Sequence, residues 1–155
     1  MSREIHLRKA TEDDVQSIEM WARSINAGQF MSRYLPERSR LILWKIVVVD
    51  GVEVGTAWIE SRLGSAGVVF LGILLGNPQL LGQGIGSAVI SDVIAEVRAT
   101  VGEVRIQLSV RSSNARAIAC YRKSGFVQIA SGEKVGRDGT LIPTLTMEFV
   151  RAVAS

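Results

Sequence analysis

The sequence predicts an α/β fold of mixed type, in which helices pack against one sheet. Strand-like and helix-like stretches alternate along all 155 residues, with no linker, low-complexity segment or internal repeat. Asp50-Gly51 separates two apolar stretches, which is a strong hairpin signal. Residues 68–75 form a nearly continuous apolar run, typical of a central strand covered on both faces. The length indicates one domain, spanning residues 1–155.

The first half of the chain supplies a strand, a helix and this hairpin. Apolar and polar residues alternate over 5–7, which predicts a short strand. Thr11 precedes three acidic residues, and a hydroxyl N-cap followed by acids at the positive end of the helix dipole predicts a helix start. Residues 24–40 look irregular, with a short helix expected after Phe30. The hairpin strands are expected at 43–49 and 52–59.

The second half adds two helices and three strands. The apolar residues of a predicted helix over 84–99 fall on one stripe, formed by Ile90, Val93, Ile94 and Val97. Strict alternation over 104–111 predicts a half-buried strand. Asn114 can cap the next helix, and Gly125 can end it. Two strands, 126–135 and 140–150, are expected around the turn Arg137-Asp138-Gly139.

Composition limits the classes of function. Hydrophobic residues make up 47% and charged residues 21%, as in globular proteins, and the net charge of +3 needs no explanation beyond solubility. No basic block indicates nucleic-acid binding, and no apolar run is long enough to cross a membrane. The N-terminus lacks the apolar region of a signal peptide. Cys120 is the only cysteine, so we expect no internal disulfide and a cytoplasmic protein.

A glycine-rich turn, Leu81-Gly82-Gln83-Gly84-Ile85-Gly86-Ser87, opens the helix predicted over 84–99. Glycines let a backbone approach a ligand closely, and the free N–H groups of a helix start suit a pyrophosphate. A ligand-free connection is the alternative. The turn lacks the Gly-Lys-Ser/Thr of a P-loop, and its Gly-x-Gly-x-Gly spacing differs from the Rossmann motif, so both of those folds fit poorly.

A second motif, Asn114-Ala-Arg-Ala-Ile-Ala-Cys-Tyr-Arg-Lys-Ser-Gly-Phe126, follows about thirty residues later. Its tyrosine, Tyr121, is either a core aromatic or a catalyst, and helical periodicity does not separate the two. Cys120 is expected as a small buried side chain rather than a nucleophile, because the sole histidine, His6, lies in the distant first strand.

Together the two motifs resemble those of the GNAT superfamily of acetyl-CoA-dependent N-acetyltransferases, which are acyltransferases. The family's cofactor motif, Gln/Arg-x-x-Gly-x-Gly/Ala, corresponds to Leu81–Gly86 here. The family's later motif, Asn-x-x-Ala-x-x-x-Tyr-x-Lys-x-Gly-Phe, is matched at Asn114, Ala117, Tyr121, Lys123, Gly125 and Phe126. The resemblance implies a mixed, mostly antiparallel sheet of about seven strands, flanked by helices, with two central strands splayed apart.

The resemblance also assigns roles in binding acetyl-CoA, with no metal. The backbone of Leu74, Leu75 and Gly76 would pair with the pantetheine arm, as an added strand does, and an amide near Leu75 would polarise the thioester carbonyl. Asn114 would contact the cosubstrate, and Tyr121 would protonate the leaving thiolate or hydrogen-bond to it. The amides that would hold the pyrophosphate are those of Gly82, Gln83, Gly84, Ile85, Gly86 and Ser87.

The implied reaction is direct acetyl transfer to a primary amine, which must first lose a proton. Many relatives place a glutamate five residues before the motif asparagine, where this chain has Ser109. Glu60 is the candidate base, although a solvated charge at the end of a strand is the simpler and preferred interpretation. A water relay and uptake of an already neutral amine remain open. The missing acid also leaves room for a non-catalytic acyl-CoA-binding sensor or assembly module.

Leu81 replaces the Gln or Arg of many members. An apolar residue there is similar to the branch that contains ribosomal-protein N-terminal, polyamine and some aminoglycoside acetyltransferases. The acceptor is expected to be a small-molecule amine or a protein N-terminal amine, chosen by residues 24–40 and the hairpin near 136–140. Three arginines in 24–40, at positions 33, 38 and 40, favour an amine attached to something acidic over a polycation. We expect no nucleic-acid or membrane partner. Dimers are common in the family, so the resemblance implies a homodimer as one possible state.

Overall fold

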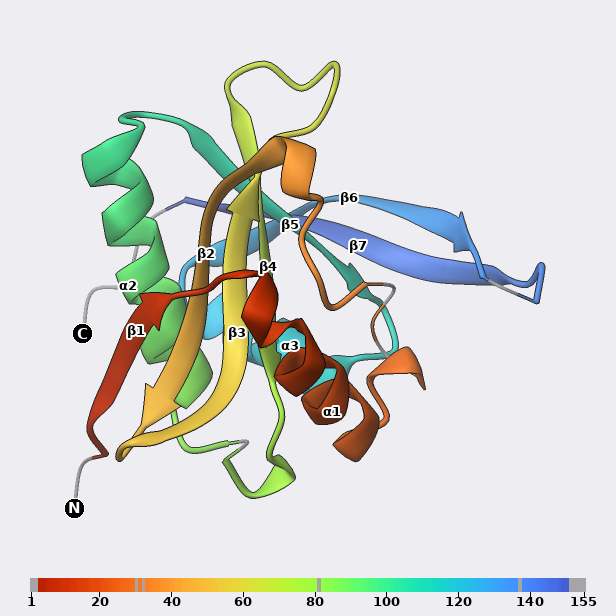
Figure 1. The fold of residues 1–155 in the computed structure, drawn as a ribbon. Coiled ribbons are helices and arrows are strands. Elements are labelled where there is room, and N and C mark those ends of the chain that lie inside the picture. Colours follow the sequence, from red (N-terminus) through yellow and green to blue (C-terminus); the bar gives the residue numbers. More distant parts are fainter. Residues whose placement is uncertain (1–2, 30, 32, 81, 137, 151–155) are drawn as a thin grey trace.

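The computed structural model describes residues 3–29, 31, 33–80, 82–136 and 138–150. Within them, one sheet of seven strands runs in the order β1-β2-β3-β4-β5-β7-β6, and only β4 and β5 are parallel neighbours (Figure 1). This confirms the mixed, mostly antiparallel sheet. The strands are β1 (Ile5–Lys9), β2 (Leu41–Val49), β3 (Val52–Glu60), β4 (Val68–Leu75), β5 (Arg105–Arg111), β6 (Phe126–Val135) and β7 (Leu141–Phe149).

Three α-helices flank the sheet in the described residues: α1 (Val15–Ser24), α2 (Ile85–Thr100) and α3 (Ala115–Lys123). Short 3-10 turns are η1 (Glu12–Asp14), η2 (Ala27–Gln29), η3 (Arg38–Arg40) and η4 (Pro78–Leu80). The described residues between η2 and η3 are irregular, so the short helix expected after Phe30 is present among the described residues only as the single 3-10 turn η3. Phe30 itself and Leu81 lie outside the described residues, as does Arg137 of the turn predicted in the last hairpin.

The predicted start at Thr11 is confirmed as a capping box. The Asp13 N–H donates to Thr11 Oγ1 at 3.3 Å, and the Thr11 N–H donates to Asp14 Oδ2 at 2.9 Å. Arg8 donates to both oxygens of Asp14, at 2.6 and 3.1 Å, which lowers the pKa of that carboxyl group. The ion pair therefore ties β1 to the start of the first helical segment.

The hairpin at Asp50-Gly51 is also confirmed. Both residues have positive φ angles, 50° and 81°, which is the geometry of the two-residue turn that matches the twist of paired strands. Gly51 adopts this conformation at no steric cost, and Asp50 is among the residue types that tolerate it.

The two faces of the sheet carry separate cores. Helices α2 and α3 cover one face, where the predicted stripe of α2 is fully buried and Ile106, Leu108 and Val110 of β5 point inward. Helix α1 covers the other face, over a cluster that includes Ile18, Trp44, Ile46, Trp58 and Leu74. The β6–β7 hairpin extends beyond the rest of the sheet (Figure 1).

The central strands β4 and β5 separate partway along their length. They pair only at Val68–Arg105, Val69–Ile106 and Phe70–Gln107, although β4 continues to Leu75 and β5 to Arg111. Beyond these pairs, β5 stays in the sheet through β7, and β4 through β3. The facing edges of β4 and β5 therefore hold backbone groups that need another partner, as expected for two splayed strands.

Candidate active site

A cavity of about 690 Å³ opens at this separation. Its size lies in the range of small-molecule and cofactor sites. The cavity is lined by β3, β4, β5, α2, α3 and the segment 24–40, together with single residues of β6 and β7. The gap between the two central strands is therefore the place where a ligand fits.

The register of the strands shows that the cavity reaches both faces of the sheet. Glu60 pairs with Phe70, which pairs with Gln107, so these side chains share one face. Because side chains alternate along a strand, Ser109 and Arg111 lie on that face too, the face covered by α1. Tyr121 of α3 packs against the core of the opposite face. We call the two parts of the cavity the glycine end (Gly82, Gly84, Gly86, Ser87) and the Glu60 end (Arg33, Glu60, Arg62, Arg111, Lys134).

Backbone N–H groups form the glycine end. Gly82 and Gly84 have φ angles of 79° and 80°, which favour glycine, and α2 begins directly afterwards. The Ala88 N–H donates to Gly84 O, so the amides just before Ala88 have no partner inside the helix. Arg116 and Lys123 of α3 also line the cavity. Free amides, the helix dipole and two cations together suit an anion such as a pyrophosphate.

Only the backbone of Gln83 and Ile85 can serve this end. The Gln83 side chain accepts from Arg3 Nε at 2.8 Å and donates to the Gln79 carbonyl at 2.5 Å. The side chain of Ile85 is buried in the core under α2.

The three residues at the end of β4 and just after it that are predicted to bind pantetheine are not equivalent. Leu74 and Leu75 line the cavity, whereas Gly76 does not. The Gly76 N–H donates to Val54 O at 2.7 Å, and its carbonyl accepts from Ser24 Oγ at 3.1 Å. Both backbone groups of Gly76 therefore already have partners. Because hydrogen-bonded pairs alternate along an antiparallel ladder, the backbone of Leu74 faces Thr56 of β3, and Leu75 is the residue of this trio whose backbone faces the gap.

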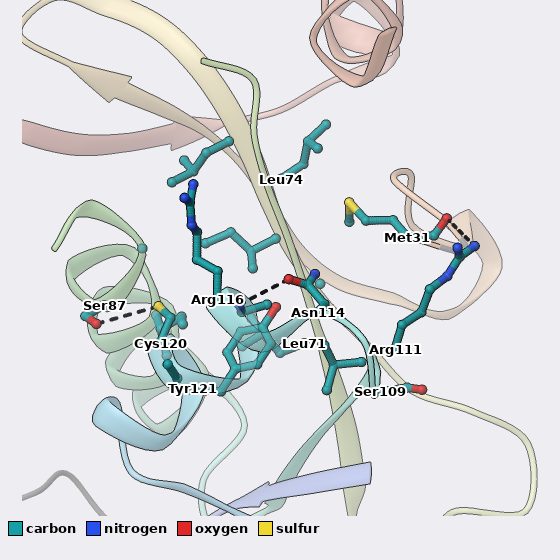
Figure 2. Close-up of a pocket in the computed structure, with 18 of the residues that line it drawn as sticks. Met31, Leu71, Leu74, Ser87, Ser109, Arg111, Asn114, Arg116, Cys120 and Tyr121 are labelled. Carbon is teal, nitrogen blue, oxygen red and sulfur yellow. Dashed lines mark hydrogen bonds between the residues drawn. The ribbon is translucent and has the colours of Figure 1, made fainter. Parts of the chain in front are cut away.

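Helix α3 presents Asn114 and Tyr121 to the cavity (Figure 2). The Ala117 N–H donates to Asn114 Oδ1 at 3.2 Å, which confirms Asn114 as the helix cap. The ring of Tyr121 packs on Phe126, with ring centroids 6.0 Å apart. Burial raises the pKa of Tyr121, so its hydroxyl stays protonated at neutral pH and can donate a proton.

Cys120 is half-buried rather than fully buried, and it lines the cavity beside α2. Its Sγ lies 3.8 Å from Ser87 Oγ (Figure 2), and a Cβ added at Gly86 would come within 3.2 Å of the same sulfur. Cys120 thus contributes to the close packing of α2 and α3, and the expectation of full burial is corrected.

Glu60 is buried, with 2% exposure, so the interpretation as a solvated strand-end charge is wrong. Arg33 donates to both carboxylate oxygens, at 3.1 and 2.5 Å, and Trp58 Nε1 donates to Oε1 at 2.8 Å. These three bonds fix the orientation of the carboxylate at the wall of the cavity.

Trp58 reaches Glu60 because its partner on β4 is Gly72, which has no side chain. A Cβ added at Gly72 would lie 2.1 Å from Cζ2 and 2.2 Å from Cε2 of the Trp58 indole. The indole therefore lies directly on the backbone of β4, and Gly72 is required for that contact.

The residues expected to choose the acceptor differ in whether they reach the cavity. From 24–40, the residues Ile25, Met31 and Arg33 line the cavity. Arg111 Nη2 donates to the carbonyls of Gly28 and Met31, both at 3.3 Å, and so fastens this segment to β5. Figure 2 shows the bond to Met31. The described residues of the 136–140 turn do not line the cavity, whereas Lys134 and Thr144 of the same hairpin do.

Sequence reasoning missed Trp58, Arg62 and Lys134 as parts of the site. Their contribution depends on strand pairing between distant segments, and no local motif marks them. Ser109, which stands in the position of the glutamate of many relatives, is half-buried and lines the cavity.

The fold and the cavity define a class of protein. The family model described as "Acetyltransferase (GNAT) family" matches residues 6–126, and the chain belongs to this family. A mycothiol acetyltransferase from Beutenbergia cavernae is 32% identical over 88 residues. That match covers 56% of this chain and 28% of the relative, so the chain spans less than a third of the relative's length.

Solved structures share the fold over nearly the whole chain. An aminoglycoside acetyltransferase in complex with coenzyme A has a TM-score of 0.76 and 25% identity, covering 96% of this chain and 95% of that one. The ribosomal-protein-S18-alanine N-acetyltransferase from Escherichia coli has a TM-score of 0.69 and 20% identity, covering 98% and 97%. The second likeness supports the fold alone, and the branch suggested by Leu81 stays a prediction.

The described residues contain neither a candidate metal site nor a candidate membrane span. No group of three or more His, Cys, Asp or Glu side chains among them could hold a metal ion. None of the helices they form is long and apolar enough to cross a membrane.

Proposed function

We propose that the chain transfers an acetyl group from acetyl-CoA directly to a primary amine, of a small molecule or a protein N-terminus. The observation that carries this proposal is the cavity between the splayed strands, which connects the glycine end to the Glu60 end past Tyr121. Residues 1–155 would act as a single N-acetyltransferase domain, in the cytoplasm.

The residues present fit acetyl-CoA. The amides of 82–87 and the cations Arg116 and Lys123 would hold the pyrophosphate and nearby phosphate. The unpaired edge of β4, where the backbone groups of Ile73 and Leu75 face away from β3, would hydrogen-bond to the pantetheine amides, much as an added strand does. Asn114 would contact the same arm with the part of its amide that does not cap α3.

Acetyl-CoA supplies an activated acetyl thioester when bound. Glu60 would accept the proton of the incoming ammonium, since an ammonium has no lone pair for attack. A β4 amide near Leu75 would donate to the developing oxyanion. Tyr121 would donate its proton to the departing sulfur, because burial keeps the phenol protonated.

A non-catalytic acyl-CoA-binding module is the second candidate function. Arg33 and Trp58 already donate hydrogen bonds to the oxygens of Glu60, which leaves this carboxylate less able to act as a base and so favours the module. Proton acceptance by Glu60 is still possible, however. Oε2 accepts only from Arg33 among the described residues, so one lone pair of that oxygen is left for a proton.

Thiol release from acetyl-CoA across a panel of primary amines separates the two functions. An acetyltransferase releases coenzyme A in proportion to amine acetylated, and the Tyr121→Phe variant releases it far more slowly. A binding module binds acetyl-CoA in calorimetry yet releases no thiol with any amine, and that result would overturn the proposal.

A further inference from the structure

Positive charge dominates the Glu60 end of the cavity. Its cationic side chains are Arg33, Arg62, Arg111 and Lys134, and Glu60 is the one acid among the described residues that line the cavity. The cations come from four separate segments: the 24–40 region, the residues after β3, β5 and β6. Such convergence from distant parts of the chain is a property of the folded site rather than of one basic stretch of sequence.

In the described part of the chain, the acid at this end forms an ion pair with one cation only. Glu60 is paired with Arg33 through two hydrogen bonds. Arg62 and Lys134 make no ion pair with any residue that the structure describes. The guanidinium of Arg62 instead stacks on the ring of Phe70, with 3.8 Å between its Cζ and the ring centroid. That contact places Arg62 on the α1 face, above the strand that borders the cavity.

These cations lie close enough to repel one another. Partial burial lowers the pKa of Lys134, and the charges of Arg62, Arg33 and Arg111 lower it further. Partial burial likewise lowers the pKa of Arg62. Cations that face one cavity raise the local potential for anions, so an anionic ligand would relieve the repulsion.

We propose that the acetyl acceptor carries an anionic group, a carboxylate or a phosphate, close to its amine, and that Arg62 and Lys134 bind this group. The inference rests on the proposed acetyl transfer and names the chemistry of its acceptor. The anion would anchor the acceptor on the α1 face, with the amine directed toward Glu60 and the gap between β4 and β5. A polycationic amine would meet like charges there and bind poorly.

Matched pairs of amines test the inference by turnover. An α-amino acid is compared with its amide, and phosphoethanolamine with ethanolamine, with spermidine as a polycation. The anionic member of at least one pair is expected to have a kcat/KM at least tenfold higher than its neutral partner, and the pair that shows it identifies carboxylate or phosphate. Equal or lower values for both anionic members, or a preference for spermidine, would overturn the inference.

Variants connect this preference to the named residues. Arg62→Gln and Lys134→Gln should each raise KM for the anionic amine at least fivefold and leave the dissociation constant of acetyl-CoA unchanged. Lys9→Gln removes the same charge from β1, outside the cavity, and should change neither constant. If the two cavity variants keep the wild-type preference, the proposed anchor is wrong.

If no amine is acetylated, the proposed acetyl transfer is wrong, but the anionic anchor is still tested by a binding measurement. The protein is saturated with coenzyme A, so that the glycine end is filled, and is titrated with inorganic phosphate in low-salt buffer. Wild-type protein and Lys9→Gln should bind phosphate at least tenfold more tightly than the Arg62→Gln/Lys134→Gln double variant. Equal binding by all three proteins, or none, would overturn the anionic anchor.

Discussion

Replacing Gly72 by alanine should disturb one wall of the active-site cavity in a way that can be estimated from the structure. The new Cβ would lie 2.1 Å from Cζ2, 2.2 Å from Cε2 and 2.6 Å from Cη2 of Trp58. Nonbonded carbon atoms need about 3.5 Å, so the indole or the strand must move by about 1.4 Å. Trp58 is 3% exposed and packed in the core under α1, so it has little room to move.

Two costs follow from this displacement. Overpacking a close-packed core costs about 1–3 kcal/mol. Moving the indole also breaks the 2.8 Å hydrogen bond from Trp58 to the Glu60 carboxylate, and bonds to charged groups contribute about 1.5–3 kcal/mol. The Gly72→Ala variant should therefore lose about 2.5–6 kcal/mol of unfolding free energy. Because Glu60 is reoriented, KM for the amine should rise more than the dissociation constant of acetyl-CoA.

Urea unfolding followed by tryptophan fluorescence measures the first effect, and steady-state kinetics the second. Gly132→Ala is the matched control: Gly132 lies on exposed β6, and an added Cβ there meets no atom within 4 Å. The control should stay within about 0.5 kcal/mol of wild type. A Gly72→Ala variant as stable as the control would refute the reasoning about the contact between Trp58 and β4.

Three further substitutions probe other parts of the account. Tyr121→Phe should lower kcat by about 10²–10⁴ while the midpoint of thermal unfolding stays near wild type, because the ring still packs and no described residue bonds the hydroxyl; an unchanged kcat would remove the acid role. Gly84→Ala places a Cβ at a φ of 80°, a strain of about 1–2 kcal/mol, and calorimetry should show weaker binding of coenzyme A. Arg8 holds the pKa of Asp14 low, so the pair stabilises the fold above about pH 4, the unfolded pKa, and loses this contribution as pH falls through the folded value. The Asp14→Asn variant should therefore have an unfolding free energy lower by about 1–3 kcal/mol at pH 7, and this free energy should depend less on pH in acid. Identical acid unfolding curves for variant and wild type would count against this role.

Much of the fold could be predicted because local signals agree with the tertiary structure. The Asp50-Gly51 turn, the Thr11 cap and the apolar stripe of α2 each specify one conformation, and the structure has all three. The segment 24–40 could not be predicted, because it has no periodicity and is positioned by distant partners. Arg111 of β5 bonds the carbonyls of Gly28 and Met31, a contact that no local pattern reveals.

The two ends of the site differ in the same way. The glycine end and Tyr121 lie in two contiguous motifs, so the sequence marks them directly. The Glu60 end is assembled by the register of paired strands. The position of its cationic side chains could therefore not be predicted from the sequence. The basic character of 24–40 suggested an acidic acceptor, but Arg38 pairs with Glu12, and only Arg33 of the three arginines lines the cavity. The cations that support the inference are instead Arg62 and Lys134, from outside that segment.

Amine-dependent release of coenzyme A from acetyl-CoA is the measurement that tests the central claim most directly. Purified protein is mixed with acetyl-CoA and each amine of the panel, free thiol is followed with time, and the acetylated product is identified by mass. We expect thiol and acetylated amine to form in equal amounts, with at least one primary amine. Tight binding of acetyl-CoA without acetylation of any amine would contradict the account.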